Sequence, residues 1–145
     1  MAITTNAICN SFKKELLEGT HNFKASGGNS FKLSLYTSSA TLGKSTTSFT
    51  SDNQVSNTGQ YASGGSALTN GGTSLSTDTA LVDYADLSFT GVTLTARGAL
   101  IYNDTQTGDP AVCVLNFGGD KTATNGTFTV QFPAFSSSAA IIRIA

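Results

Sequence analysis

The C-terminal third of the chain alternates short apolar segments with turn-forming residues. The apolar segments, each rich in β-branched or aromatic residues, are 98–103, 111–117, 127–132 and 139–144. The sequences between them are Asn103-Asp104, Gly108-Asp109-Pro110, Gly118-Gly119-Asp120 and Asn125-Gly126. Segments of strand length, separated by such residues, predict antiparallel strands joined by short turns. We therefore expect an all-β fold.

Three more strands are expected upstream, at 31–36, 79–84 and 87–96. In the first of them Phe31, Leu33 and Leu35 alternate with more polar residues, which is typical of a strand with one buried face. In the third, the apolar frame slips by one residue at Gly91, which predicts a β-bulge. About seven short strands in about 110 residues indicate an antiparallel β-sandwich of two sheets.

One helix is expected at the N-terminal end, over residues 6–18. Ile8, Phe12 and Leu16 recur at four-residue spacing, and Gly19 follows as a stop signal. The pattern predicts an amphipathic helix that packs its apolar stripe against a sheet. The alternative is that the same stripe docks on another subunit.

The segment 37–78 differs from the rest of the chain. It is rich in Ser, Thr, Gly and Asn and has few apolar residues, and it is long for a loop within a compact domain. Either it contains weak edge strands, at 60–62 and 66–69, or it is an extended arm that becomes ordered on neighbouring subunits, where backbone hydrogen bonds would supply affinity. The candidate interface residues from the helix and this segment are Ile8, Phe12, Leu16, Phe49, Val55 and Tyr61.

Length and charge narrow the classes of protein. The 145 residues correspond to a single domain, 1–145, in which residues 79–145 and the strand 31–36 form the main sandwich. The formal net charge is −1 and only 12% of residues are charged, so the clustered Lys and Arg typical of nucleic-acid binding are missing. No secretory signal and no apolar run of about 20 residues is visible, so we expect a protein made in a cytoplasm, with no membrane partner.

Residues able to do chemistry are few and scattered. His21 is the single histidine, no Gly-x-Ser-x-Gly sequence accompanies it, and we interpret it as a turn or surface residue. The sequence 118–122 lacks the glycine spacing of a phosphate-binding loop. Cys9 and Cys113 show no disulfide framework, although a disulfide between them is an alternative. We expect no enzyme activity and no catalytic, cofactor-binding or metal-binding residues.

Two ligand classes remain as alternatives. Calcium at a subunit interface could use aspartate oxygens, and the candidates are Asp83, Asp86, Asp104, Asp109 and Asp120. Carbohydrate could stack on exposed aromatic rings, for which the tyrosines Tyr36, Tyr61, Tyr84 and Tyr102 are the candidates. Tyrosines at sheet edges or interfaces explain the second set more simply.

Several longer strings, at 10–23, 31–42, 96–102, 120–126 and 128–133, give the chain a family resemblance. It resembles small virion structural proteins of tailed bacteriophages over nearly its full length. The resemblance implies a non-enzymatic protein of the virion that is made in the host cytoplasm. A capsid decoration (cement) protein is the first expectation, bound to the major capsid protein or other virion subunits as a homo-oligomer, with a trimer as the guess. The alternative is a neck, tail or fibre-associated protein, including an adhesin that recognises host surface glycan.

Overall fold

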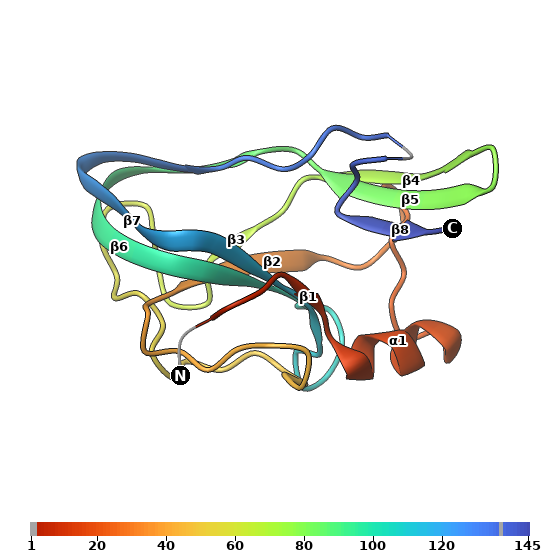
Figure 1. Cartoon of the computed structure of the whole chain (residues 1–145), viewed down its shortest axis with the longest axis horizontal. Helices are drawn as coiled ribbons and strands as arrows, with labels where there is room; N and C mark the ends of the chain where they lie inside the picture. The colour runs from red at the N-terminus through yellow and green to blue at the C-terminus, as the bar shows by residue number, and fades with distance from the viewer. Residues whose placement is uncertain (1–2, 137) are drawn as a thin grey trace.

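The computed structural model describes residues 3–136 and 138–145, and it is built mainly from antiparallel strands (Figure 1). The elements in chain order are β1 (Ala7–Ile8), α1 (Asn10–Leu17), β2 (Phe31–Tyr36), β3 (Ser66–Ala67), β4 (Asn70–Ser76), β5 (Thr79–Tyr84), β6 (Leu87–Asn103), β7 (Ala111–Val130) and β8 (Ile142–Ile144). One sheet has the order β1-β7-β6-β2-β3 and the other β4-β5-β8. The expected all-β sandwich-like fold with one N-terminal helix is confirmed.

The longest feature is a two-stranded ribbon formed by β6 and β7, of 17 and 20 residues. Figure 1 shows the ribbon curving at one end of the molecule, so that its outer half lies level with the β4-β5-β8 sheet. Only residues 98–103 of β6 pair with β2. Because the ribbon passes from one layer to the other, it closes that end of the core.

The ribbon corrects the expected division of residues 87–132 into strands. We expected 87–96 and 98–103 to be separate strands, and 111–117 and 127–132 likewise, but each pair forms one strand. The turn-forming residues between them lie in register shifts within the β6–β7 ladder, and Asn125 has φ +44°. Glycine and asparagine adopt positive φ in β-bulges as well as in turns. Here they bend a continuous strand and do not reverse the chain.

Two glycines mark the bends in β6. The bulge expected at Gly91 is confirmed, since register shifts between Phe89 and Val92 and Gly91 has φ +65°. At Gly98 a Cβ would lie 2.4 Å from the Leu115 carbonyl oxygen. That contact is too close for any side chain, so the ribbon bends where the chain has glycine.

The helix is shorter than expected at its start. Residues 7–8 form β1, in which Ile8 pairs with Cys113 of β7, and the helix begins at Asn10 rather than at residue 6. Cys9 has the extended conformation of an N-cap. Ile8 therefore belongs to a strand, and the predicted helical stripe keeps Phe12 and Leu16 only.

The end of the helix agrees with the sequence. The backbone N–H of Gly19 donates to the Leu16 carbonyl at 3.2 Å, and that of Thr20 donates to the Glu15 carbonyl at 2.9 Å. These two bonds form the Schellman motif that ends many helices.

The segment 37–65 is irregular but folded onto its own chain, and it is not an arm extended from the body. Val55 and Tyr61 are buried, and Phe49 is packed against the core. Of the two expected edge strands, the one at 66–69 is present as β3, whereas 60–62 has only a bridge from Tyr61 to Thr58. The first of the two explanations, weak edge structure, therefore describes this segment better.

Tyrosine hydroxyls attach this segment to the sheet. Tyr61 accepts a hydrogen bond from the Leu35 N–H of β2 at 2.8 Å, and its ring lies 5.1 Å from that of Phe89 in the other layer. Tyr36 donates to the Thr50 carbonyl at 2.7 Å, and Tyr102 donates to the Gly64 carbonyl. Buried backbone N–H and C=O groups need hydrogen-bond partners. In this segment the tyrosine hydroxyls supply them, in place of the backbone groups of a neighbouring strand.

Candidate functional site

The single histidine is a buried structural group and not the surface residue that the sequence suggested. The side chain of His21 is fully buried, and its ring packs against Phe12 at a centroid distance of 4.9 Å. Its Nε2 lies 3.3 Å from Glu15 Oε1, and its Nδ1 lies 3.1 Å from Asn103 Nδ2. Burial lowers the pKa of His21, against the opposing effect of Glu15.

The partners of Asn103 fix the tautomer of this histidine. The Asn103 side-chain oxygen accepts from the Thr105 N–H at 3.0 Å and from the Gln106 N–H at 3.3 Å, so its NH2 group faces His21. Nδ1 must then accept a hydrogen bond, and Nε2–H donates to Glu15. If His21 were protonated, its Nδ1–H and the NH2 group of Asn103 would be two hydrogen-bond donors facing each other. The neutral ring is therefore favoured.

The two cysteines are free and buried. Burial raises the pKa of Cys9 to about 11 and that of Cys113 to about 12. At neutral pH both are thiols, and a thiol is a poor nucleophile and metal ligand compared with the thiolate.

The aspartates considered for calcium do not gather at one place. Asp104 lies 3.3 Å from Lys32 Nζ, Asp120 accepts from Arg97 Nε at 2.8 Å, and Asp86 accepts from a backbone N–H. Within residues 3–136 and 138–145, no group of three or more His, Cys, Asp or Glu side chains is placed to hold a metal ion.

All four tyrosines are inside the molecule. Tyr36, Tyr61, Tyr84 and Tyr102 are 0%, 1%, 4% and 2% exposed. None offers a ring face to solvent, so carbohydrate stacking on these residues has no surface to use.

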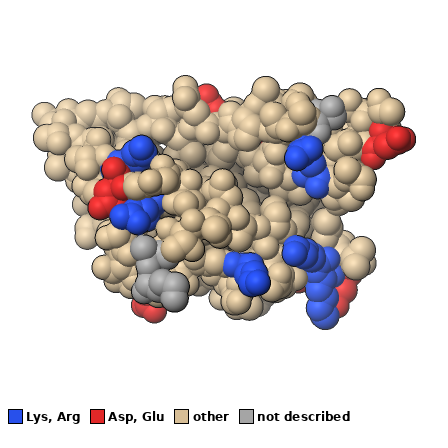
Figure 2. Space-filling model, viewed as in Figure 1, with Lys and Arg blue, Asp and Glu red and all other residues tan. Residues whose placement is uncertain are grey.

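The surface itself carries little charge. On the face drawn in Figure 2, the charged side chains form a few small, separate groups on an otherwise uncharged surface. On the ribbon, hydroxyl side chains pair across the two strands: Ser88 and Thr95 of β6 bond Thr129 and Thr122 of β7 at 2.8 and 2.9 Å.

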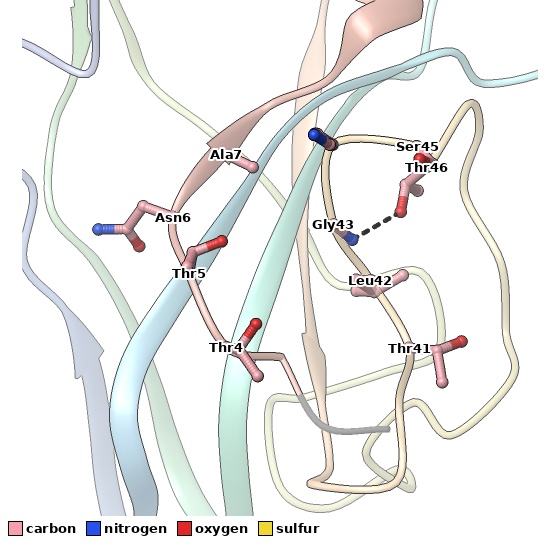
Figure 3. Close-up of a pocket in the computed structure, with 10 residues that line it drawn as sticks. Thr4, Thr5, Asn6, Ala7, Thr41, Leu42, Gly43, Ser45 and Thr46 are labelled. Atoms are coloured by element: carbon pink, nitrogen blue, oxygen red, sulfur yellow. Dashed lines mark hydrogen bonds between the residues drawn. The ribbon is translucent and has the colours of Figure 1, made fainter.

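One hollow is open and is lined mainly by residues with hydroxyl or amide side chains. It has a volume of about 890 Å³ and lies between residues 4–7 and 41–46 (Figure 3). Lys44 is the one charged residue that lines it, and the Thr46 hydroxyl already accepts from the Gly43 N–H at 3.0 Å. The lining brings together no set of converging charged groups that would define a ligand.

The second hollow is an apolar cleft between α1 and the β4-β5-β8 sheet, with a volume of about 150 Å³. Its walls are almost wholly apolar and comprise Phe12, Leu16, Phe23, Thr73, Ala80, Leu81, Val82, Ile142 and Ile144. We refer to it below as the apolar cleft.

Exposed large apolar side chains occur on α1 and on the sheet that lines the apolar cleft. Leu17, at the end of α1, is 90% exposed, Leu75 of β4 is 72% exposed and Ile144 of β8 is 55% exposed. Leu75 pairs with Ala80, which pairs with Ile144. Directly opposed residues share a face of a sheet, so these three form one row, on the face that lines the cleft.

The six predicted interface residues do not form one surface. Phe12 and Leu16 line the apolar cleft, whereas Ile8 and Phe49 are partly buried against other parts of the core. Val55 and Tyr61 are 6% and 1% exposed, so neither is available for a contact in this conformation. The six residues leave out Leu75 and Ile144, which are exposed. The available signal for Leu75 was an isolated leucine in the hydroxyl-rich stretch 70–78.

Comparisons with known protein families, curated proteins and solved structures found no match. Among the described residues, no helix is long and apolar enough to cross a membrane.

Proposed function

We propose that this chain is a non-enzymatic structural protein that binds other subunits through the apolar surface around the apolar cleft. The observation that carries the proposal is the row Leu75–Ala80–Ile144, in which Leu75 and Ile144 are exposed large apolar side chains. Contiguous exposed apolar side chains on a soluble domain are typical of a contact surface. The groups that could do chemistry, His21 and the two cysteines, are buried and held by structural contacts.

The assembly that we propose is a virion, and the support for this is the sequence resemblance to virion structural proteins of tailed phages. Within that class we propose capsid decoration, with the major capsid protein as partner. A surface with few charges supports the proposal in one respect. Binding through apolar and hydroxyl groups depends little on salt, since salt screens interactions between charges.

The test is co-sedimentation with capsids of the tailed phage that carries the gene, stripped of accessory proteins. We expect saturable binding at a fixed ratio to the major capsid protein. Replacing Ile144, an exposed residue that lines the apolar cleft, with Asp should weaken binding about tenfold or more, because an apolar contact would become a buried charge. The matched control is Ser56→Asp, at an exposed position of the irregular segment.

Two results would contradict the proposal. One is no binding by the wild-type chain, and the other is binding that falls steeply with salt. Binding to host cells or their glycans, without binding to capsids, would support the alternative of a tail or fibre-associated adhesin.

A further inference from the structure

We propose that two copies of this chain pair through the free edge of β4, in an antiparallel dimer centred on Ser74. The inference extends the proposed function, because it names a second copy as a partner of the same apolar surface. It does not depend on a virion.

β4 is an open edge strand, whereas the other strands that end the two sheets, β1, β3 and β8, are protected. Among the described residues, the regular part, 73–76, has backbone pairing to β5 only. Native proteins protect edges with very short strands or with charges. Here β1 and β3 have two residues each, and β8 has three with Arg143 in the middle, whereas β4 has seven residues and neither charge nor proline.

A second copy suits this edge for electrostatic and geometric reasons. The edge is neutral, so two copies meet without like-charge repulsion. In a strand, the backbone N–H and C=O groups of successive residues point alternately to one side and the other. In a pair of identical strands, an odd-numbered residue must therefore lie opposite an odd-numbered residue, and an even-numbered one opposite an even-numbered one. A twofold axis at Ser74 satisfies this condition, with Ser74 opposite Ser74 and Thr73 opposite Leu75.

This register also brings an apolar side chain to the apolar cleft. Thr73 is one of the cleft's lining residues, and the register sets Leu75 of the second copy beside it, on the same face. The cleft's volume of about 150 Å³ is of the size that holds a benzene-sized group, and a leucine side chain is smaller than that. Each copy thus supplies an apolar side chain and receives one.

The size of the contact sets its strength and stoichiometry. The bulge between Asn70 and Thr73 confines regular pairing to about four residues per copy. A standard stable interface buries roughly 1,200 Å² or more and involves about 20 residues on each side, so this contact is smaller. We therefore expect a dimer that dissociates on dilution. A twofold contact uses the edge once in each copy and closes, so the structure favours a dimer here over the trimer guessed from sequence.

The first experiment is sedimentation equilibrium of the full chain from micromolar to millimolar concentration. The expected result is a reversible rise in mass to that of two chains. Leu75→Lys, at an exposed position, should remain monomeric at every concentration while keeping the wild-type circular dichroism spectrum. A wild-type chain that stays monomeric, a trimer, or a Leu75→Lys chain that dimerises as well as the wild type would each overturn the inference.

A second experiment tests the register. In a dimer centred on Ser74, the two Ser74 Cα atoms lie about 4.5–5.5 Å apart, within the range for a disulfide. Ser74→Cys should therefore cross-link on mild oxidation, whereas the control Ser76→Cys, opposite residue 72, should not. Equal cross-linking of both would refute the register. A wild-type chain that stays monomeric at every concentration but still co-sediments with capsids would leave the proposed function standing without the dimer.

Discussion

Replacing Tyr61 with Phe removes a single buried oxygen and tests what holds the irregular segment on the sheet. That oxygen accepts a hydrogen bond from the Leu35 N–H at 2.8 Å, and it lies 2.9 Å from Gln54 Oε1 and 3.3 Å from the Leu35 carbonyl oxygen. The ring would keep its packing against Phe89, because phenylalanine has the same ring. The variant therefore isolates the hydrogen bonds.

The expected cost follows from which partners are left without a bond. The Leu35 carbonyl keeps the Val55 N–H at 2.9 Å, and Gln54 Oε1 keeps the Gly64 N–H at 2.7 Å. The Leu35 N–H, in a residue that is 0% exposed, loses its partner. A buried donor without a partner costs about 1–3 kcal/mol, so we expect a loss of about 2 kcal/mol in the free energy of unfolding. For a chain of this length, that lowers Tm by about 4–8 °C.

The assay is urea unfolding followed by circular dichroism, with Tyr84→Phe as the matched control. Tyr84 is 4% exposed, and its hydroxyl has no hydrogen-bond partner among the described residues. Removing that oxygen should leave stability unchanged or raise it by up to about 1 kcal/mol. A Tyr61→Phe variant within about 0.5 kcal/mol of wild type, or an equal loss in both variants, would refute the reasoning.

Three further predictions concern other buried groups. Burial lowers the pKa of His21 from about 6.5. Its contribution to stability is therefore complete above about pH 6.5 and declines as the pH falls toward the folded-state pKa. Urea unfolding from about pH 8 to 5 measures this decline, and a free energy of unfolding that does not change with pH would contradict the prediction. Replacing Gly98 with Ala should cost about 2 kcal/mol or more, because the new Cβ would lie 2.4 Å from the Leu115 carbonyl oxygen; a melting temperature equal to wild type would refute the close approach. Cys9 and Cys113 should react with a thiol reagent at least about tenfold more slowly in the native chain than in urea, because burial raises the pKa of both; equal rates would show that the native thiols are accessible.

Short segments rich in apolar residues predicted two of the strands with their bounds. The strands at 31–36 and 79–84 have in the structure the bounds expected from sequence. The division of the ribbon was wrong, because Gly118 and Asn125 have positive φ in bulges as they would in turns. Sequence shows that the chain bends at such residues. Whether it then reverses depends on the strand opposite, which in this chain continues through both positions.

The irregular segment and the contact surface were less accessible to sequence reasoning. Its order depends on long-range bonds from tyrosine hydroxyls to backbone groups, such as Tyr61 to Leu35, and a residue pattern does not reveal such partners. Phe12 and Leu16 were among the predicted interface residues, and the structure places them at the apolar cleft. Leu75 was passed over because a single leucine has no period.

The exposed row beside the cleft follows from the length of the helix. The row Thr73–Val82–Ile142 lies over α1, and there Val82 and Ile142 are 8% and 6% exposed. The next row, which contains Leu75, lies about 7 Å further along the strands. Eight residues make a helix of only about 12 Å, and the cap at Gly19 ends it there. The helix therefore ends before it reaches the row with Leu75, and this connects the stop signal in the sequence to the proposed contact surface.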